Sequence, residues 1–178
     1  IKTGKIELDL VKLMQRKEKI VRQLTAGIGF LFKKNKITHI NGTASFVDEQ
    51  NIKVKSSKES TLSAKNFIIA TGSSSIAIPS ISVDEKSTVT STGALSLSSV
   101  PKTMLVIGGG YIGLEMGSVW SRLGTKVTVV EALDQIVPTM DAEIAIQFMK
   151  SLQKQGLEFK LSHKVIATKP KTSDVEVT

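Results

Sequence analysis

The chain has 178 residues, 40% of them hydrophobic and only four of them proline, so we expect a buried core of one ordinary or two small domains rather than disorder. It contains no cysteine, which excludes a disulfide framework, a thiolate metal site and a cysteine nucleophile within these residues. No apolar run approaches the roughly 18 residues of a membrane span, and no signal-peptide pattern is present, so we expect no membrane partner.

The formal net charge is +8, and much of the positive excess lies between Lys12 and Lys36. A basic patch of this kind could bind nucleic acid or an acidic protein. The charges here lie between apolar positions at helical spacing, and no stacking aromatic residues occur among them. We therefore favour the solvated face of a helix and expect no nucleic-acid partner.

The first predicted element is an amphipathic helix of roughly five turns, capped by Asp9 and extending to Leu31, because apolar residues recur near the helical period. Gly27 and Gly29 could loosen it. Turn residues then separate short predicted strands. These strands are expected at residues 37–40, 44–47, 52–54 and 67–70.

Residues 71–100 are rich in serine and threonine, and they are predicted to connect two structural units. Within this connector we expect a short strand near residues 88–89 and a helical turn near residues 94–95.

The most informative pattern begins at residue 103. The apolar run 103–107 leads into Gly108-Gly109-Gly110-Tyr111-Ile112-Gly113, a helical pattern follows to Leu123, and Gly124 ends it. A second apolar run, 126–130, stops at Glu131. This is the spacing G-x-G-x-x-G after a strand and at the start of a helix, followed by a second strand with an acid at its end.

Each part of this pattern has a physical role in dinucleotide binding. Gly108 permits the tight turn, Gly110 lets a pyrophosphate approach the backbone, and Gly113 lets the helix pack close to the sheet. The helix N-terminus offers free N–H groups and a partial positive charge to phosphates. A glycine-rich turn in an ordinary parallel unit would explain one glycine, but not the further glycines and the acid. We therefore predict a bound dinucleotide.

Glu131 also predicts which dinucleotide is bound. A carboxylate at the end of the second strand hydrogen-bonds the ribose hydroxyls of NAD, and it would repel the 2′-phosphate of NADP. Residues 132–137 contain no arginine or lysine that could accept this phosphate. We expect NAD(H) to be preferred over NADP(H).

After Glu131, Asp141 is predicted to cap a helix that ends at Gly156, and two strands are expected near residues 159–161 and 165–168. The alternation of strand and helix from 103 to 168 predicts an α/β fold with a Rossmann-like, doubly wound parallel sheet. Residues 1–70 contain no strand–glycine-turn–helix opening, so we expect them to be the latter part of another α/β unit.

The stretch from Ile107 to Glu131 resembles the NAD-binding motif of the dihydrolipoamide dehydrogenases, which are flavoproteins of the pyridine nucleotide–disulfide oxidoreductases. Residues 16–36 resemble the helix and exit strand of their FAD domain, and residues 68–73 resemble the second flavin motif of the wider superfamily. The resemblance is colinear over essentially the whole chain. It implies a partial FAD-binding domain at 1–75, a connector at 76–100 and a partial NAD-binding domain at 101–178, so an internal fragment is expected.

The resemblance implies two sets of cofactor contacts. The NAD set is Gly108, Gly110, Tyr111, Ile112, Gly113, Glu115, Glu131 and Val165. The FAD set is Ala44, Thr71, Gly72 and Ser73.

Several of these assignments have a structural alternative. Glu115, expected on the nicotinamide side, could equally be a first-turn carboxylate favoured by the helix dipole. Val165, expected against the adenine, could be a core residue of a strand. Residues 71–73 could form a plain strand-exit turn. Ala44 stands where the family usually has a glycine near the flavin adenine.

By the same resemblance, the parent enzyme passes electrons from dihydrolipoamide to a disulfide, then to FAD and finally to NAD. The dihydrolipoamide is carried on the acyltransferase component of 2-oxo acid dehydrogenase complexes. The parent is expected to be a homodimer of the bacterial cytoplasm or the mitochondrial matrix. No catalytic residue and no metal ligand are expected in this chain. Two alternatives stay open: another FAD/NAD(P) disulfide reductase of the mercuric or glutathione type, and a non-catalytic NAD-binding module.

Overall fold

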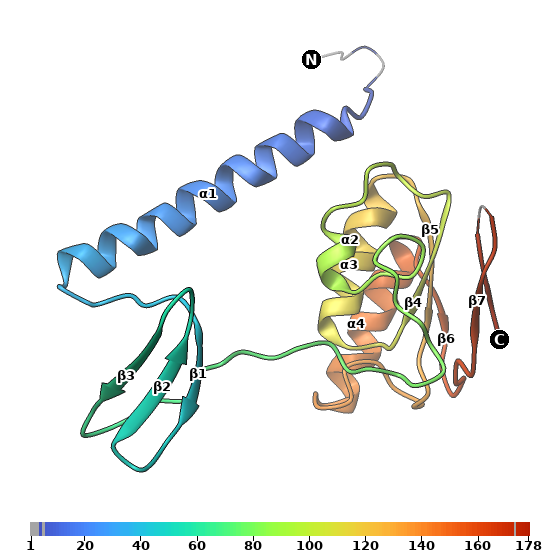
Figure 1. Ribbon diagram of the computed structural model, residues 1–178. Coiled ribbons are helices and arrows are strands. Elements are labelled where there is room, and N and C mark those ends of the chain that lie inside the picture. Colours follow the sequence, from blue (N-terminus) through green and yellow to red (C-terminus); the bar gives the residue numbers. More distant parts are fainter. Residues whose placement is uncertain (1–3, 5, 173) are drawn as a thin grey trace. The chain divides into compact units, whose positions relative to one another are not determined.

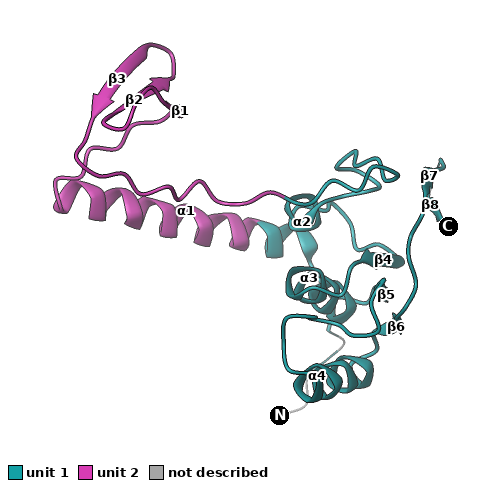
Figure 2. Ribbon diagram, turned by 90° about the horizontal axis from the view of Figure 1, so that it is seen from below, with its two compact units in different colours: residues 1–14, 75–178 teal, residues 15–74 magenta. Residues whose placement is uncertain are grey.

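The computed structural model describes residues 4, 6–172 and 174–178 (Figure 1). These residues form two compact units, coloured separately in Figure 2. Unit 2 consists of residues 15–74, and unit 1 consists of residues 75–178 together with the described residues before 15.

The first element is the helix α1 (Leu10–Lys34), which has 25 residues. The predicted cap is confirmed, because the Asp9 carboxylate accepts the N–H of Lys12 at 3.0 Å. The helix extends three residues beyond the predicted Leu31, and Gly27 and Gly29 do not interrupt it. Lys33 and Lys34 lie in the last turn, where positive charge is favoured by the helix dipole. None of its residues is buried, so the expected apolar face of the helix remains exposed.

Unit 2 also contains a three-stranded antiparallel sheet in the order β1-β2-β3. Its strands are β1 (Thr43–Phe46), β2 (Asn51–Lys55) and β3 (Glu59–Ser63). The first two confirm the predicted strands, whereas β3 was not predicted because its sequence, Glu-Ser-Thr-Leu-Ser, is mostly polar. Val54 in the central strand is the only buried residue of this sheet, with 5% of its surface exposed.

Two strand predictions in unit 2 are wrong. Residues 37–40 and 67–70 have no regular structure. A strand needs a hydrogen-bonded neighbour, and no strand of the described residues pairs with either segment. As a result Ile68 and Ile69 are 93% and 72% exposed.

Unit 1 contains the predicted parallel sheet, in the order β4-β5-β6. Its strands are β4 (Thr103–Ile107), β5 (Lys126–Val130) and β6 (Glu158–Lys160). The helices α3 (Tyr111–Arg122) and α4 (Ala142–Lys154) lie beside this sheet in Figure 1. The core between them is aliphatic, and its buried members are Leu114, Val127, Val129, Ile136, Val137, Ala145, Leu152 and Leu157. The α/β prediction is therefore confirmed.

The ends of these helices also follow the prediction. Gly124, with φ +107°, follows the last turn of α3 and lets the chain reverse into β5. The Asp141 carboxylate accepts the N–H of Glu143 at 3.0 Å and so caps α4.

The remaining elements differ in part from expectation. The strand expected at 165–168 begins only at its last residue, as β7 (Thr168–Pro170), which pairs with an unpredicted β8 (Val175–Val177) in an antiparallel hairpin. The strand expected near residues 88–89 is absent from the described chain, which forms a turn there. The helical turn near residue 94 is confirmed as α2 (Ser91–Ala94).

The connector from residue 75 onward is anchored in unit 1. The Trp120 indole N–H donates to the Ala94 carbonyl at 3.0 Å, and Trp120 is 2% exposed. Earlier in the connector, the Asp84 carboxylate accepts the N–H groups of Lys86, Ser87 and Thr88 at 2.8–2.9 Å. A hydrogen bond from the Ser87 hydroxyl, together with these N–H groups, holds the pKa of Asp84 well below its usual range.

Candidate dinucleotide site

The site is built where β4 turns into α3. Gly108 has φ +99°, a conformation that L-residues rarely adopt, and its N–H donates to the Val130 carbonyl at 2.8 Å. Gly110 has extended backbone angles, φ −74° and ψ 162°, and it precedes α3 without any side-chain cap. The turn is therefore fixed to β5 at its start and leaves the helix N-terminus open.

Four of the five glycines between residues 108 and 117 have two different kinds of surroundings. A Cβ atom placed on Gly108 or Gly110 would meet no atom within 4 Å. A Cβ atom on Gly113 would lie 2.9 Å from Val106 Cγ1, and one on Gly117 would lie 3.2 Å from Val127 Cγ1. Two glycines thus leave free space beside the turn, while the other two let α3 pack against β4 and β5.

The N-terminus of α3 offers hydrogen-bond donors. The N–H of Leu114 donates to the Gly110 carbonyl at 3.1 Å, which begins the helical pattern. The N–H groups of Tyr111, Ile112 and Gly113 precede this bond, and an α-helix supplies no internal partner for donors at these positions. Tyr111 and Ile112 are 68% and 47% exposed, so an anion can reach these donors.

The carboxylate of Glu131 lies against the same turn. Its Oε2 accepts the N–H of Gly109 at 2.6 Å, and its Oε1 accepts the N–H of Leu133 at 2.8 Å. Only 9% of the residue is exposed. An ionised carboxylate has about four lone-pair sites, so roughly one acceptor position remains on each oxygen. Two acceptors side by side suit the two vicinal hydroxyls of a ribose.

The chain after β6 covers one side of Glu131. The N–H of His163 donates to the Glu131 carbonyl at 2.9 Å, and the N–H of Ser162 donates to the Leu133 carbonyl at 2.8 Å. Two residues further on, Val165 is buried, with 8% exposed. The structure therefore brings the segment that contains Val165 to the strand end that carries Glu131.

Glu115 lies in a different place from the glycine turn. It is exposed on α3 and lines an apolar groove of about 450 Å³ between α3 and α4, together with residues such as Val119 and Phe148. Among the described residues, no side-chain hydrogen bond or ion pair joins Glu115 to Glu131 or to residues 108–110.

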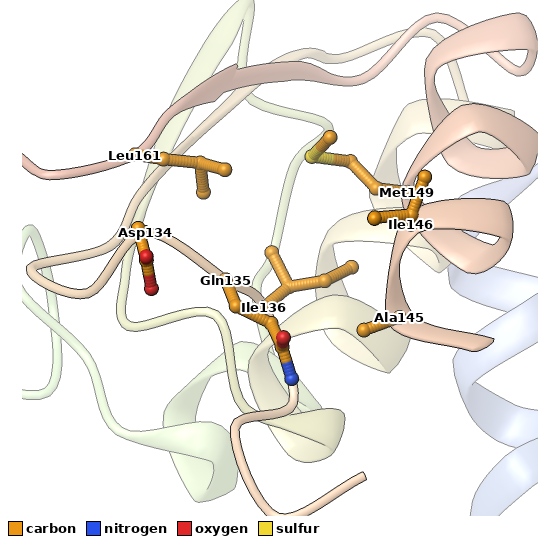
Figure 3. Close-up of a pocket in the computed structure, with 7 residues that line it drawn as sticks. All are labelled: Asp134, Gln135, Ile136, Ala145, Ile146, Met149 and Leu161. Carbon is orange, nitrogen blue, oxygen red and sulfur yellow. The ribbon is translucent and has the colours of Figure 1, made fainter. Parts of the chain in front are cut away.

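Beside the turn, unit 1 contains a small pocket of about 200 Å³ (Figure 3). It is lined by Asp134, Gln135, Ile136, Ala145, Ile146, Met149 and Leu161. The loop after Glu131 supplies the first three of these residues, and α4 supplies the next three. Ile136 belongs both to this pocket and to the surroundings of Gly109, since a Cβ atom on Gly109 would lie 3.0 Å from Ile136 Cγ2.

The four residues predicted to contact FAD belong to unit 2. Ala44 lies in β1 opposite Val54, while Thr71, Gly72 and Ser73 follow in a segment without regular structure. All four are exposed, and Gly72 has φ +76°. Among the described residues, no hydrogen bond joins Ala44 to residues 71–73.

Sequence reasoning missed three residues that shape the turn: Gly109, Ile136 and Val137. The fingerprint leaves the second position of G-x-G-x-x-G unspecified. In the loop after Glu131, the lack of positive charge predicts only the preference for NAD. The triple glycine was the available signal, because the fingerprint does not need a glycine at position 109.

The parallel β–α–β unit, the open glycine turn and the buried acid have the geometry of α/β dinucleotide-binding proteins. The chain belongs to the pyridine nucleotide–disulphide oxidoreductases, because the model of this family matches residues 2–178.

Curated relatives agree with this family. The chain is 49% identical to mitochondrial dihydrolipoyl dehydrogenase of Pisum sativum over 180 aligned residues, covering 100% of this chain and 36% of that protein. It is 53% identical to dihydrolipoamide dehydrogenase of Chaetomium thermophilum, over 93% of this chain and 34% of that one. It is also 48% identical to leghemoglobin reductase of Vigna unguiculata, over 100% of this chain and 34% of the relative. The chain thus spans about a third of the length of these relatives.

Solved structures show the same fold. The flavoprotein disulfide reductase RclA of Escherichia coli matches with a TM-score of 0.78 and 27% identity, over 96% of this chain and 39% of that chain. LpdA of Mycobacterium tuberculosis matches with a TM-score of 0.87 over 98% of this chain and 40% of that one, and at 23% identity it supports the fold alone. In the part of the chain that the structure describes, no helix has the length and apolar character to cross a bilayer.

Proposed function

We propose that residues 101–178 bind NAD(H) as part of a dihydrolipoamide dehydrogenase. The observation that carries this proposal is the geometry of Glu131, a nearly buried carboxylate that holds the glycine turn and keeps an acceptor position on each oxygen. Its negative charge would repel a 2′-phosphate, so NADH is preferred over NADPH.

The residues around the turn have separate roles in this proposal. The N–H groups at the start of α3 bind the diphosphate, and the missing side chains of Gly108 and Gly110 let it approach the backbone. Glu131 accepts hydrogen bonds from the adenosine ribose, and Val165 packs against the adenine. Glu115 acts on the nicotinamide side of the cofactor. When bound, NAD supplies a nicotinamide ring that accepts hydride.

Residues 1–75 are proposed as part of an FAD-binding domain, with residues 76–100 as the connector to the NAD-binding part. The family relationship and the flavoprotein name of RclA support this assignment. Ala44, Thr71, Gly72 and Ser73 are the proposed flavin contacts. Because all four are exposed in unit 2, further protein would be needed to enclose the flavin.

For the whole protein we propose oxidation of dihydrolipoamide carried on the acyltransferase component of 2-oxo acid dehydrogenase complexes, with NAD as the acceptor. The relatives named dihydrolipoyl or dihydrolipoamide dehydrogenase, such as those at 49% and 53% identity, support this proposal. We also propose a homodimer in the mitochondrial matrix or the bacterial cytoplasm. Disulfide exchange requires cysteine, and these 178 residues contain none. We therefore expect no dihydrolipoamide oxidation by the 178 residues alone.

Calorimetric titration of the full chain with NADH and NADPH tests the binding proposal. We expect NADH to bind at least tenfold more tightly than NADPH, which corresponds to about 1.4 kcal/mol. Absence of NADH binding at millimolar ligand to well-folded protein would overturn the proposal, and tighter binding of NADPH would overturn the assigned role of Glu131.

A further inference from the structure

The peptide groups of Gly109 are held from two sides by the loop that follows β5. The Gly109 N–H donates to Glu131 Oε2 at 2.6 Å, and the Gly109 carbonyl accepts the N–H of Val137 at 2.8 Å. Gly109 is itself buried. Glu131 and Val137 therefore hold the N–H and the carbonyl of Gly109, which fixes the orientation of its backbone.

The side chain of Ile136 fills the space beside Gly109. A Cβ atom on Gly109 would lie 3.0 Å from Ile136 Cγ2, 3.3 Å from Ile136 Cα and 3.2 Å from Glu131 Oε2. The two distances to Ile136 are shorter than ordinary carbon–carbon contacts of about 3.5–4.0 Å, and all three are tighter than ordinary van der Waals contact. An alanine at this position would have to displace Ile136, Glu131 or both. A glycine at position 109 therefore lets this loop lie against the turn without any such shift.

The backbone of Val137 is strained. Its φ of +41° is unusual for a β-branched residue, and Pro138 follows it directly. Besides the bond from its N–H to Gly109, its carbonyl accepts the N–H of Met140 at 2.8 Å, and its side chain is 4% exposed. Strained conformations persist where the surroundings determine them, and they concentrate at functional sites.

We propose that Ile136 and Val137 are positioning residues of the dinucleotide site. They fix the Gly109 peptide groups, and through them they fix the direction in which the N–H groups of the turn face the diphosphate. Neither side chain needs to touch the nucleotide for this effect. The inference rests on the proposed binding of NAD(H), and it adds that affinity depends on the loop 131–138 as well as on the fingerprint residues.

The test compares the NADH dissociation constants of full-chain variants by calorimetry, at a temperature where melting curves show each variant to be folded. For Ile136→Ala we expect NADH binding at least fivefold weaker than in the unchanged chain. The matched control is Leu157→Ala, which truncates a core residue just before β6 that is 3% exposed and lies in the same hydrophobic cluster. Its melting temperature should fall similarly, while its NADH affinity should stay within twofold.

A second comparison isolates the contact between Gly109 and Ile136. Gly109→Ala should weaken NADH binding at least tenfold. In Gly109→Ala/Ile136→Ala the two losses should be less than additive, because removal of Cγ2 makes room for the new methyl group. Unchanged NADH affinity in Ile136→Ala, or strictly additive losses in the double variant, would overturn the inference. Absence of NADH binding by the unchanged chain would instead overturn the proposed function.

Discussion

Gly113 of α3 lies so close to Val106 of β4 that a Cβ atom on the glycine would be 2.9 Å from Val106 Cγ1. The same atom would be 3.1 Å from the Gly108 carbonyl oxygen, which belongs to the turn itself. The helix whose N-terminus is proposed to bind the cofactor therefore packs on the strand that leads into the turn. In the proposed site, packing and cofactor binding depend on different glycines of one motif.

Gly113→Ala is expected to destabilise the fold by up to about 2 kcal/mol. Forcing a methyl group against Val106 costs about 1–3 kcal/mol, and the better helix propensity of alanine offsets about 1 kcal/mol of that cost. Urea unfolding followed by circular dichroism measures the change. Equal or greater stability of the variant would show that α3 can move away from β4 without cost.

Gly110→Ala is the counterpart variant, because a Cβ atom there meets open space and the backbone is in an ordinary extended conformation. We expect its unfolding free energy to fall by less than about 1 kcal/mol, the scale of losing a good helix-capping residue. NADH affinity should nevertheless fall roughly tenfold or more, because the methyl group occupies the space where the diphosphate approaches. Full NADH affinity in this variant would place the diphosphate elsewhere.

Glu131→Gln keeps the shape of the side chain and removes its charge. A glutamine has one acceptor oxygen, so it cannot accept both the Gly109 and the Leu133 N–H as the carboxylate does. One buried donor loses its partner, which costs about 1–3 kcal/mol of stability. NADH affinity should fall roughly tenfold or more, and the preference over NADPH should narrow because the repulsion of the 2′-phosphate is gone. Titration with both nucleotides measures the two effects. An unchanged ratio of the NADH and NADPH dissociation constants would contradict the expected loss of preference.

Trp120→Phe tests how the connector is anchored. The variant leaves the Ala94 carbonyl without the indole donor. A buried acceptor without a partner lowers the free energy of unfolding by about 1–3 kcal/mol. We expect a lower calorimetric melting temperature and faster tryptic cleavage at Lys86, which lies in the connector before α2. Cleavage at an unchanged rate would mean that α2 remains docked on α3 without this hydrogen bond.

Asp84→Asn tests the turn at the start of the connector through its pH dependence. Because the folded-state pKa of Asp84 is depressed, chiefly by the Ser87 hydroxyl, its stabilising effect is present above the unfolded-state pKa of about 3.9. That effect is lost as the pH falls toward the folded-state value. The unchanged chain should melt at a higher temperature than the variant at pH 7, and the difference should shrink below about pH 4. A difference that stays constant down to pH 3 would rule out the carboxylate as its cause.

The sequence predicted residues 103–154 of unit 1 well because the signals there are local. Hydrophobic periodicity, capping residues and turn glycines correctly predicted β4, α3, β5 and α4. Each of these signals depends on residues close together in the chain. The contact of Ile136 with Gly109 could not be predicted in this way, because it depends on how a loop folds back over a distant turn. Glu131, at the start of this loop, is already 22 residues from Gly109 in the sequence.

Unit 2 was predicted less well, for a physical reason. Strands at 37–40 and 67–70 were expected from apolar content alone, but a strand forms only beside another strand, and the described chain supplies none there. The polar strand β3 was missed for the opposite reason, because its pairing with β2 outweighs its weak propensity.

The placement of the only tryptophan has a practical consequence. Trp120 is nearly buried in α3, and unit 2 contains no tryptophan. Intrinsic fluorescence excited at the red edge of the protein absorption band therefore reports on unit 1 alone, whereas helical ellipticity has contributions from unit 2, through α1, and from the helices of unit 1. The two signals followed in one denaturation experiment reveal, without any label, whether the units unfold together or independently.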